Sequence, residues 1–551
     1  NLALVQKKKG NLEGAVKTYM KGLDIDPKNL SIMKNLGIAY IDKGEVTKAI
    51  LIFNKALELN PLSVSVLSYL ADAYTKMENF AKAVEILKKA KKINPKDALT
   101  YCAIADIYRK QKKLRMSILY FERAIKLDAK NDRFYNNIGT ALVDLGENKK
   151  AANSYRQAIK INSSNVQAIK NLGIVLTKIG SFGEAINYFK KAVALKPDYS
   201  EALYGLGRVY LDQGNYSESI YNYNKVLEIE PKHFNSLNAL TWPMVYTKNF
   251  RKGWEMYEYR WYVEPAIKEK WPIKDRELWG SQEDKRIILW REQGIGDDII
   301  FLSLVPEAFK ISKTLSVYID PRMIPLCTRS MPGINFKKYT PGSFDGEEFD
   351  YHLPMGSLPR LFRSSEKDFD RVLKGYLKAD PERVKSLRDE LGLSGKKVIG
   401  ISWKSINSLN NLKKSLSLMD LGKVFKALDI TLVNLQYGDV DEEIKEFKNE
   451  TGIDVLQCGS VDNREDLDGL AALIEMCDLV VSTSNVTIHL AGALGKEAWV
   501  LLPYVSNFWW LLDRTDSIWY PSLKLYRQKK FGEWDNVTLG LRQDLIKKFD
   551  T

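Results

Sequence analysis

The first 265 residues of this 551-residue chain repeat a pattern with a period of 34. Proline recurs at one register, at Pro27, Pro61, Pro95, Pro197, Pro231 and Pro265. A second register carries a small residue such as Ala15, and a third carries a large one such as Tyr19. A unit of this length cannot bury its apolar face alone, so neighbouring units must stack. The pattern predicts an α-solenoid over residues 1–265, with two antiparallel helices per unit and a long concave surface.

A Leu or Ile followed by Gly or Ala recurs at the same period, as in Leu36-Gly37 and Leu172-Gly173. With the other registers, this pair resembles the tetratricopeptide repeat, where small residues stand at helix crossings and proline ends the second helix. The resemblance covers residues 1–265 and implies a groove that binds a partner protein.

Asparagine precedes this pair in four units, at Asn1, Asn35, Asn137 and Asn171, and other residues fill the remaining units. An amide side chain donates and accepts hydrogen bonds at once, so a ladder of asparagines can hold an extended polypeptide. The alternative is that this helical position merely tolerates asparagine. O-GlcNAc transferase is similar in arrangement and has a more regular ladder. Asn35, Asn137 and Asn171 are therefore candidate acceptor-binding residues.

Composition restricts the partners and the compartment. The net charge of +14 would suit nucleic acid, but the lysines are scattered through the repeats at exposed spacing, which favours a solvated face and no nucleic-acid partner. No apolar run reaches the length of about 18 residues that a membrane span needs. Four cysteines without paired spacing and three histidines predict a reducing, cytoplasmic setting and no metal site. An oligomer is compatible with all of these observations.

Beyond the repeats the periodicity changes. The last unit is rich in Trp and Tyr, which favours a hydrophobic cap between the repeats and the next domain, and residues 266–285 form a connector. Short apolar runs then alternate with helical stretches over residues 286–380 and again over 381–551. This alternation predicts two Rossmann-like α/β halves facing a cleft, with ligands at the carboxyl ends of the strands. We expect residues 341–375, which contain several Pro and Gly, to be irregular.

Three short segments carry the candidate chemistry of the second half. Gln293-Gly-Ile-Gly-Asp297 follows an apolar strand and opens a helix, so Gly294 and Gly296 form a turn beside the acid Asp297. Ser482–Thr487 also joins a strand to a helix, and its hydroxyl and amide side chains exceed what one helix cap needs, which indicates a phosphate site. Gly400–Lys404 ends a third strand, and Lys404 either faces the cleft, where it would neutralise a phosphate, or is solvated on the loop that follows. Candidate donor-binding residues are Lys404, Lys414, Ser415, Thr483, Ser484, Asn485 and Thr487.

These segments, with His489-Leu-Ala-Gly-Ala-Leu-Gly-Lys496, resemble the heptosyltransferase-type GT-B glycosyltransferases, and in particular bacterial proteins in which that domain follows tetratricopeptide repeats. The resemblance implies inverting sugar transfer without a metal, with Asp297 as general base and Gly294 and Gly296 on the acceptor side. The Ser/Thr turn would hold the phosphate of a nucleotide-sugar, which is a co-substrate and not a cofactor. Heptosyltransferases usually carry Asp-Thr where this chain has Ser484-Asn485. The resemblance therefore does not identify ADP-heptose as the donor, nor which sugar is transferred.

The sequence therefore predicts a protein O-glycosyltransferase that modifies Ser/Thr hydroxyls of an acceptor held by the repeats, such as flagellin or another surface protein. Two alternatives stand beside it. One is a glycosyltransferase acting on lipopolysaccharide, and the other is a non-catalytic adaptor whose nucleotide-binding domain has degenerated. An acid at a helix N-terminus is also an ordinary stabilising cap, which is the structural alternative for Asp297.

Overall fold

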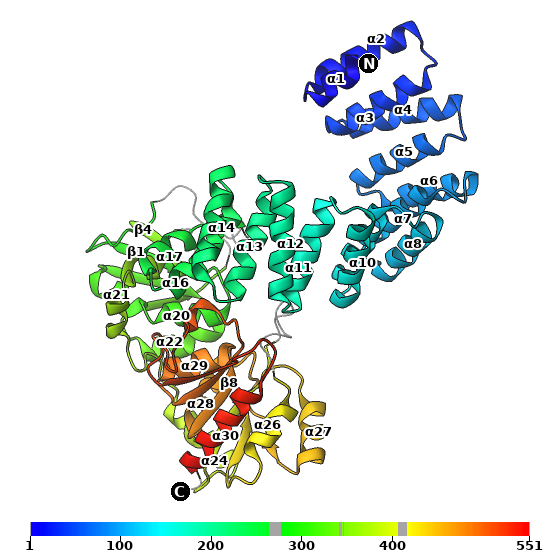
Figure 1. The fold of residues 1–551 in the computed structure, drawn as a ribbon. Helices are drawn as coiled ribbons and strands as arrows, with labels where there is room; N and C mark the ends of the chain where they lie inside the picture. The colour runs from blue at the N-terminus through cyan, green and yellow to red at the C-terminus, as the bar shows by residue number, and fades with distance from the viewer. Residues whose placement is uncertain (1, 264–276, 341–343, 345, 406–415, 550–551) are drawn as a thin grey trace. The chain divides into compact units, whose positions relative to one another are not determined.

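The computed structural model describes residues 2–263, 277–340, 344, 346–405 and 416–549. The chain divides into two compact units, Asn1–Val209 and Tyr210–Thr551 (Figure 1). The sequence places the end of the repeats at residue 265, so the last repeat helices belong to the second unit.

The first unit is a series of helix pairs stacked one after another (Figure 1), and the predicted α-solenoid is confirmed. Its helices are α1 Leu2–Lys8, α2 Leu12–Ile25, α3 Leu30–Asp42, α4 Val46–Leu59, α5 Val64–Lys76, α6 Phe80–Ile93, α7 Ala98–Lys110, α8 Leu114–Leu127, α9 Asp132–Asp144, α10 Asn148–Ile161, α11 Val166–Lys178 and α12 Phe182–Leu195. Helix α13, Ser200–Asp212, ends in the second unit.

Side-chain size explains the repeated Gly. A Cβ added to Gly37 would lie 2.3 Å from the ring of Phe53, and one added to Gly173 would lie 2.9 Å from the ring of Phe189. Both distances are too short for a real contact, so the first helix of each of these units needs glycine where the aromatic ring of the second helix crosses it. The recurring pair in the sequence is thus a packing requirement.

The second unit begins with the remaining repeat helices. They are α14 Tyr216–Ile229, α15 Phe234–Ala239, α16 Thr241–Tyr246, α17 Phe250–Tyr257 and α18 Arg260–Val263. Trp254 of α17 is 1% exposed, stacks on Trp509 at 5.9 Å and donates to the Arg363 carbonyl at 2.6 Å. The aromatic last unit therefore packs into the α/β region of the same compact unit.

The first α/β half is built on a parallel sheet of order β3-β2-β1-β4. Its strands are β1 Arg286–Trp290, β2 Thr314–Ile319, β3 Asn335–Lys338 and β4 Tyr351–Pro354. Its helices are α20 Ile295–Leu302, α21 Val305–Ile311, η1 Pro321–Met323, α22 Ile324–Ser330, η2 Met355–Ser357, α23 Leu358–Phe362 and η3 Glu366–Arg371. The segment expected to be irregular thus contains β4, which pairs with β1.

The second α/β half is built on a parallel sheet of order β10-β9-β8-β5-β6-β7. Its strands are β5 Val398–Ser402, β6 Thr431–Asn434, β7 Val455–Leu456, β8 Leu479–Thr483, β9 Ala498–Leu502 and β10 Leu523–Arg527. Its helices are α24 Pro381–Glu390, α26 Leu418–Phe425, α27 Asp441–Thr451, α28 Leu467–Met476, α29 Val486–Leu494, η4 Phe508–Trp510 and α30 Asp535–Phe549. Two parallel sheets flanked by helices confirm the α/β class of this region.

Candidate functional site

The glycine turn lies at the carboxyl end of β1. The strand ends at Trp290, and α20 begins at Ile295 with Gly294 as its N-cap. Asp297 stands in the first turn of α20, and its backbone N–H donates to the Gly294 carbonyl at 3.1 Å. The positive end of the helix dipole stabilises a carboxylate at this position.

Two buried phenols lie within electrostatic reach of Asp297. Burial is the main cause that raises the pKa of Tyr257 and of Tyr520, and the negative charge of Asp297 raises both further. Tyr257 belongs to α17, and Tyr520 lies just before β10. Asp297 is therefore near both the last repeat helices and the second α/β half.

Arg291 holds the neighbouring acids. Its Nε lies 2.8 Å from Asp298 Oδ2, and its Nη1 lies 2.7 Å from Asp320 Oδ2. Asp298 is 2% exposed, and burial raises its pKa although Arg291 opposes the rise. Burial also opposes the charge of Asp320, but hydrogen bonds from Arg322 and the charge of Arg291 lower its pKa to about 2. Asp298 is thus engaged in a buried ion pair beside the turn.

A buried pair that the sequence analysis did not select supports the start of the same loop. Arg260 Nη2 lies 2.9 Å from Glu292 Oε1, and both residues are at most 3% exposed. Burial raises the pKa of Glu292 to about 7, although Arg260 lowers it. The next residue, Gln293, donates from Nε2 to the Tyr257 hydroxyl at 2.5 Å. The sequence signal for this pair is Arg260, a charged residue within the aromatic segment Tyr257–Trp261.

The two α/β halves approach each other closely at Gly296. A Cβ at Gly296 would lie 3.2 Å from His489 Cδ2 on α29, so only a residue without a side chain fits without displacement. His489 is 7% exposed, stacks on Trp510 with ring centroids 5.2 Å apart, and has its Nδ1 3.1 Å from the Tyr520 hydroxyl. The hydroxyl of Tyr376 donates to the Ile299 carbonyl of α20 at 2.5 Å. The glycine turn is thus fixed against the helix that follows the hydroxyl turn.

Most polar side chains of the hydroxyl turn bond within the protein. Ser482 Oγ donates to Asn485 Oδ1 at 3.0 Å, and Asn485 Nδ2 donates to Ser402 Oγ at 2.7 Å. Thr487 Oγ1 donates to the Leu435 carbonyl at 3.3 Å. Asn485 is the N-cap of α29, yet its side chain makes no capping hydrogen bond. These side chains tie β8 to β5 and β6.

Ser484 and Thr483 differ from their neighbours. Ser484 is half-buried, and its Oγ accepts a hydrogen bond from Trp510 Nε1 at 2.9 Å. Thr483 Oγ1 is buried and has no hydrogen-bond partner among the residues that the structure describes.

Lys404 is paired within its own half. Its Nζ lies 2.6 Å from Glu443 Oε2 on α27, and Trp403 Nε1 donates to the other oxygen of the same carboxylate at 2.8 Å. The backbone N–H of Lys404 donates to Gln436 Oε1 at 3.0 Å. Lys414 and Ser415, the other two residues predicted for the donor from this loop, lie outside the described residues.

A cavity of 300 Å³ lies where the carboxyl ends of the two sheets meet. The first half lines it with Ile295 of α20 and Arg322 of η1, and the second half with Arg464 and with Val486 at the start of α29. All three guanidinium nitrogens of Arg322 are engaged, since Nε and Nη2 donate to the Asp320 carboxylate and Nη1 donates to the Arg464 carbonyl at 2.9 Å. The cavity therefore adjoins both predicted turns and has two guanidinium groups in its lining.

The first unit brings two of the three predicted asparagines together. Asn171 Nδ2 donates to Asn136 Oδ1 at 3.0 Å, and Asn136 Nδ2 donates to Asn137 Oδ1 at 3.3 Å. Asn137 and Asn136 line a cavity of 640 Å³ on the repeats. Asn35 is half-buried on α3, outside this cavity.

The described residues offer neither a metal-binding cluster nor a membrane-spanning helix. They contain no group of three or more His, Cys, Asp and Glu side chains placed to hold a metal ion. Within the same residues, none of the helices combines the length and apolar character needed to span a membrane.

Comparison with protein families confirms the repeats. Tetratricopeptide repeat profiles match residues 1–29, 43–101, 98–131, 139–180 and 165–232. Tetratricopeptide repeats are therefore confirmed in the first half of the chain, and the matched profiles end at residue 232, before the predicted end at residue 265.

Individual relatives cover parts of the chain. Protein FlbA of Caulobacter vibrioides (strain ATCC 19089 / CIP 103742 / CB 15) is 30% identical over 320 residues, which are 54% of this chain and 52% of that protein. The chain thus spans about half the length of this curated relative. Among solved structures, YrrB, described as a TPR protein with an unusual peptide-binding site, is 24% identical and covers 34% of this chain and 96% of its own, with a TM-score of 0.29. PilF of Pseudomonas aeruginosa is 16% identical and covers 38% of this chain and 96% of its own, with a TM-score of 0.34.

Proposed function

We propose that this protein is an inverting O-glycosyltransferase that moves a sugar from a nucleotide-sugar to Ser/Thr hydroxyls of an acceptor protein bound by the repeats. The observation that carries the proposal is the 300 Å³ cavity between the two sheets, which is lined by both α/β halves and adjoins the turn that holds Asp297. Ligands of open parallel sheets bind at this edge. Flagellin or another bacterial surface protein is the acceptor that the family resemblance suggests.

Asp297 is the proposed general base. It takes the proton of the acceptor hydroxyl while the hydroxyl oxygen forms a bond to the anomeric carbon on the face opposite the leaving group. The bond between that carbon and the phosphate oxygen breaks, and the nucleotide leaves with the bonding electron pair. The proton then passes from Asp297 to solvent, which restores the carboxylate.

The leaving phosphate needs positive partners. Arg322 and Arg464 line the cavity, and so does Val486, the first residue of α29. Guanidinium groups and helix N-termini both stabilise developing phosphate charge. Ser482, Asn485 and Thr487 position the start of α29 in this proposal. Ser482 bonds to Asn485, which bonds to Ser402 of β5, and Thr487 bonds to the Leu435 carbonyl after β6.

The acceptor would enter through the repeats. The cavity at Asn136 and Asn137 offers amide groups that are linked to one another and to Asn171. Amide side chains bond to a peptide backbone whatever its sequence, so such a surface suits an extended acceptor segment.

The test is an intact-mass assay of candidate acceptor proteins, flagellin included, with UDP-, ADP-, GDP- and CMP-linked sugars. We expect a mass increase of one sugar and release of the nucleotide with one donor class. The variant Arg464→Gln should slow transfer about tenfold, since one charged contact to a phosphate is removed. Arg251→Gln, an exposed arginine of α17 outside the cavity, is the matched control and should keep full rate. No mass change with any donor would refute the transferase.

A non-catalytic adaptor is the second candidate, and one observation favours it. The hydroxyl turn is bonded internally and the Lys404 ammonium is paired with Glu443, so neither is poised for a phosphate in this structure. Isothermal titration with UDP, ADP, GDP and CMP separates the candidates. An adaptor should bind none of the four, whereas a transferase should bind one of them. A mass increase on lipopolysaccharide and on no protein would instead support the lipopolysaccharide alternative.

A further inference from the structure

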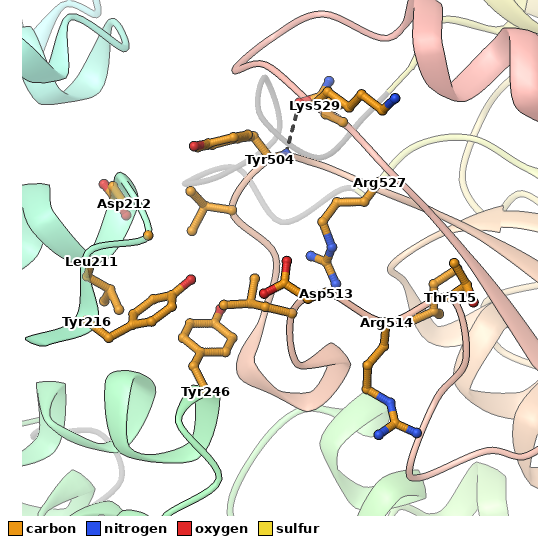
Figure 2. Close-up of a pocket in the computed structure, with 15 residues that line it drawn as sticks. Leu211, Asp212, Tyr216, Tyr246, Tyr504, Asp513, Arg514, Thr515, Arg527 and Lys529 are labelled. Carbon is orange, nitrogen blue, oxygen red and sulfur yellow. Dashed lines mark hydrogen bonds between the residues drawn. The ribbon is translucent and has the colours of Figure 1, made fainter.

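A second cavity of the second unit, of 550 Å³, is shown in Figure 2, and none of its lining residues belongs to either predicted turn. On one side it is lined by the loop that follows α13, by Tyr216 at the start of α14 and by Tyr246 of α16. On the other side it is lined by Tyr504, which follows β9, and by the segment Arg527–Lys529 at the end of β10. Its volume falls in the range of about 300–1,000 Å³ that is usual for ligand sites.

Two of its lining residues, Arg527 and Gln528, each carry a buried nitrogen donor that has no acceptor in the described part of the chain. Arg527 uses Nη1 for the Ser506 hydroxyl and Nη2 for the Leu511 carbonyl at 2.8 Å. Gln528, which is 3% exposed, uses Oε1 to accept from the Tyr504 N–H at 3.0 Å. Among the residues that the structure describes, Arg527 Nε and Gln528 Nε2 are buried without a hydrogen-bond partner. Buried donors of this kind are rare and costly, and they indicate an absent acceptor.

The charged side chains in the lining of this cavity are Arg514, Arg527 and Lys529 against Asp212 and Asp513, which leaves a formal charge of +1. The ion pairs within 4.0 Å in the described part of the chain do not include Arg527. Burial lowers the pKa of Arg527, whereas Tyr246, Tyr216 and Asp513 raise it. Lys529 is exposed at the rim of the cavity. Arg527 is half-buried, and a guanidinium at such a position without an ion-pair partner is stabilised by an anion that enters from outside.

The same cavity is coupled to the glycine turn through one loop. Arg527 Nη2 also donates to the Trp510 carbonyl at 3.3 Å, and the Trp510 ring stacks on His489. His489 in turn lies against Gly296. Arg527 is therefore linked to the glycine turn through two intervening residues, Trp510 and His489. The opposite wall consists of repeat helices, and repeats of this type bind polypeptides.

We propose that this cavity binds the carboxylate of an Asp or Glu side chain of the acceptor polypeptide. Gln528 Nε2 and Arg527 Nε donate to its oxygens, and Lys529 adds positive charge at the rim. The inference rests on the proposed function for its acceptor, and it adds a preference for an acidic residue near the glycosylated one. The planar donors of Arg and Gln suit a planar carboxylate.

The test is titration calorimetry of the full chain, without nucleotide-sugar, against the capped peptides Ac-Ala-Asp-Ala-NH2 and Ac-Ala-Asn-Ala-NH2. We expect the Asp peptide to bind about tenfold more tightly, the size of one charge-assisted hydrogen bond. Equal affinity for the two peptides would overturn the proposal. Succinate binding as tightly as the Asp peptide would assign the cavity to a free carboxylate and would likewise overturn it.

Two variants and one control localise the effect. Gln528→Glu keeps the Oε1 acceptor and the side-chain size but replaces the unpartnered donor by a negative oxygen, so the preference for Asp should disappear. Lys529→Gln changes an exposed side chain, so it tests the proposal even if Gln528→Glu fails to fold, and it should weaken the Asp peptide about twofold to fivefold. Lys530→Gln, at an exposed position paired with Glu533 outside the cavity, should bind as the unchanged protein does. A preference for Asp that survives both cavity variants would contradict the assignment.

Failure of this proposal and failure of the proposed function give different results. Sugar transfer to an acceptor without any preference between the peptides would refute the carboxylate site alone. Preferential binding of the Asp peptide without transfer from any donor would refute the transferase and leave the acidic-peptide site standing.

Discussion

The two turns at the carboxyl edges of the sheets look alike in the sequence and differ in the structure. Each joins a strand to a helix and carries polar residues at the helix start. In the hydroxyl turn, Ser482 bonds to Asn485, and Asn485 and Thr487 bond to Ser402 of β5 and to the Leu435 carbonyl after β6. The glycine turn has few side chains, and its surroundings leave Asp297 beside the phenols of Tyr257 and Tyr520. A turn rich in polar side chains can thus serve packing, and a turn poor in them can present one acid.

The largest expected effect is on the acid of the glycine turn. Asp297→Asn should lower the rate of sugar transfer about 10²- to 10⁴-fold, because the amide cannot accept the hydroxyl proton. The melting temperature should stay nearly unchanged, since the side-chain volume is kept. Asp439→Asn, at an exposed position before α27, is the matched control and should transfer at the normal rate. Full activity of Asp297→Asn would show that Asp297 is not the general base and that the glycine turn does not differ from the hydroxyl turn in this respect.

The second effect concerns the stability of the hydroxyl turn. Asn485→Ala should lower the free energy of unfolding by about 2–3 kcal/mol, because it leaves the buried hydroxyls of Ser402 and Ser482 with fewer partners. Ser484→Ala, in the same turn but half-buried, should cost less than about 1 kcal/mol. Urea unfolding followed by circular dichroism measures both. Equal costs would mean that the turn is not held by Asn485.

The third effect uses the pH dependence of stability to distinguish the ion pairs beside the glycine turn from the neutral hydrogen bonds of the hydroxyl turn. Asp320 is ionised in the folded protein down to its pKa of about 2, which lies below the ordinary value of 3.8. Its ion pairs with Arg291 and Arg322 therefore add stability above about pH 4, and this contribution of about 2 kcal/mol is lost as the pH falls toward 2.

Asp320→Asn should thus be less stable than the unchanged protein at pH 6, and the difference should shrink below pH 4. Urea midpoints from pH 2 to 7 measure it. Asn485→Ala should show no such convergence, since its hydrogen bonds are neutral. A constant difference for Asp320→Asn across the whole range would contradict the depressed pKa.

The smallest effect concerns Lys404. Its pair with Glu443 is about one-third exposed on each side, so a double-mutant cycle of Lys404→Met and Glu443→Gln should give a coupling below about 1 kcal/mol. If the ammonium turns toward a nucleotide diphosphate, Glu443→Gln should tighten nucleotide binding about twofold to fivefold. Titration with the nucleotide of the active donor measures this. Unchanged affinity in both single variants would place Lys404 among purely structural residues.

The repeats were predictable because their chemistry is local. A period of 34 residues appears directly in the sequence, and the requirement at Gly37 comes from Phe53, a residue of the same repeat. The parallel α/β class followed from alternating apolar and helical segments in the same way. Strand β4 was missed because it is short and ends at Pro354 within a segment rich in Pro and Gly.

The sites were less predictable because their partners are distant in sequence. Whether Asn485 faces a ligand or a strand depends on Ser402, which is 83 residues away. Lys404 is neutralised by Glu443 on another helix. The cavity at Arg527 combines segments from α13, α16 and β10, and no motif marks it. Local pattern indicates which residues can carry chemistry, and tertiary contacts decide which of them are available.

The crossing of Gly37 and Phe53 has a consequence for how such proteins diversify. Because the match of Gly37 with Phe53 is completed within one repeat, it is copied whole when that unit is duplicated, whereas Gly205, which meets Phe189 of the preceding repeat, depends on its neighbour. A gene lineage can thus lengthen or shorten its partner-binding surface by recombination, while point mutation adjusts the α/β region separately. The partner-binding surface of the repeats and the α/β region can therefore evolve at different rates.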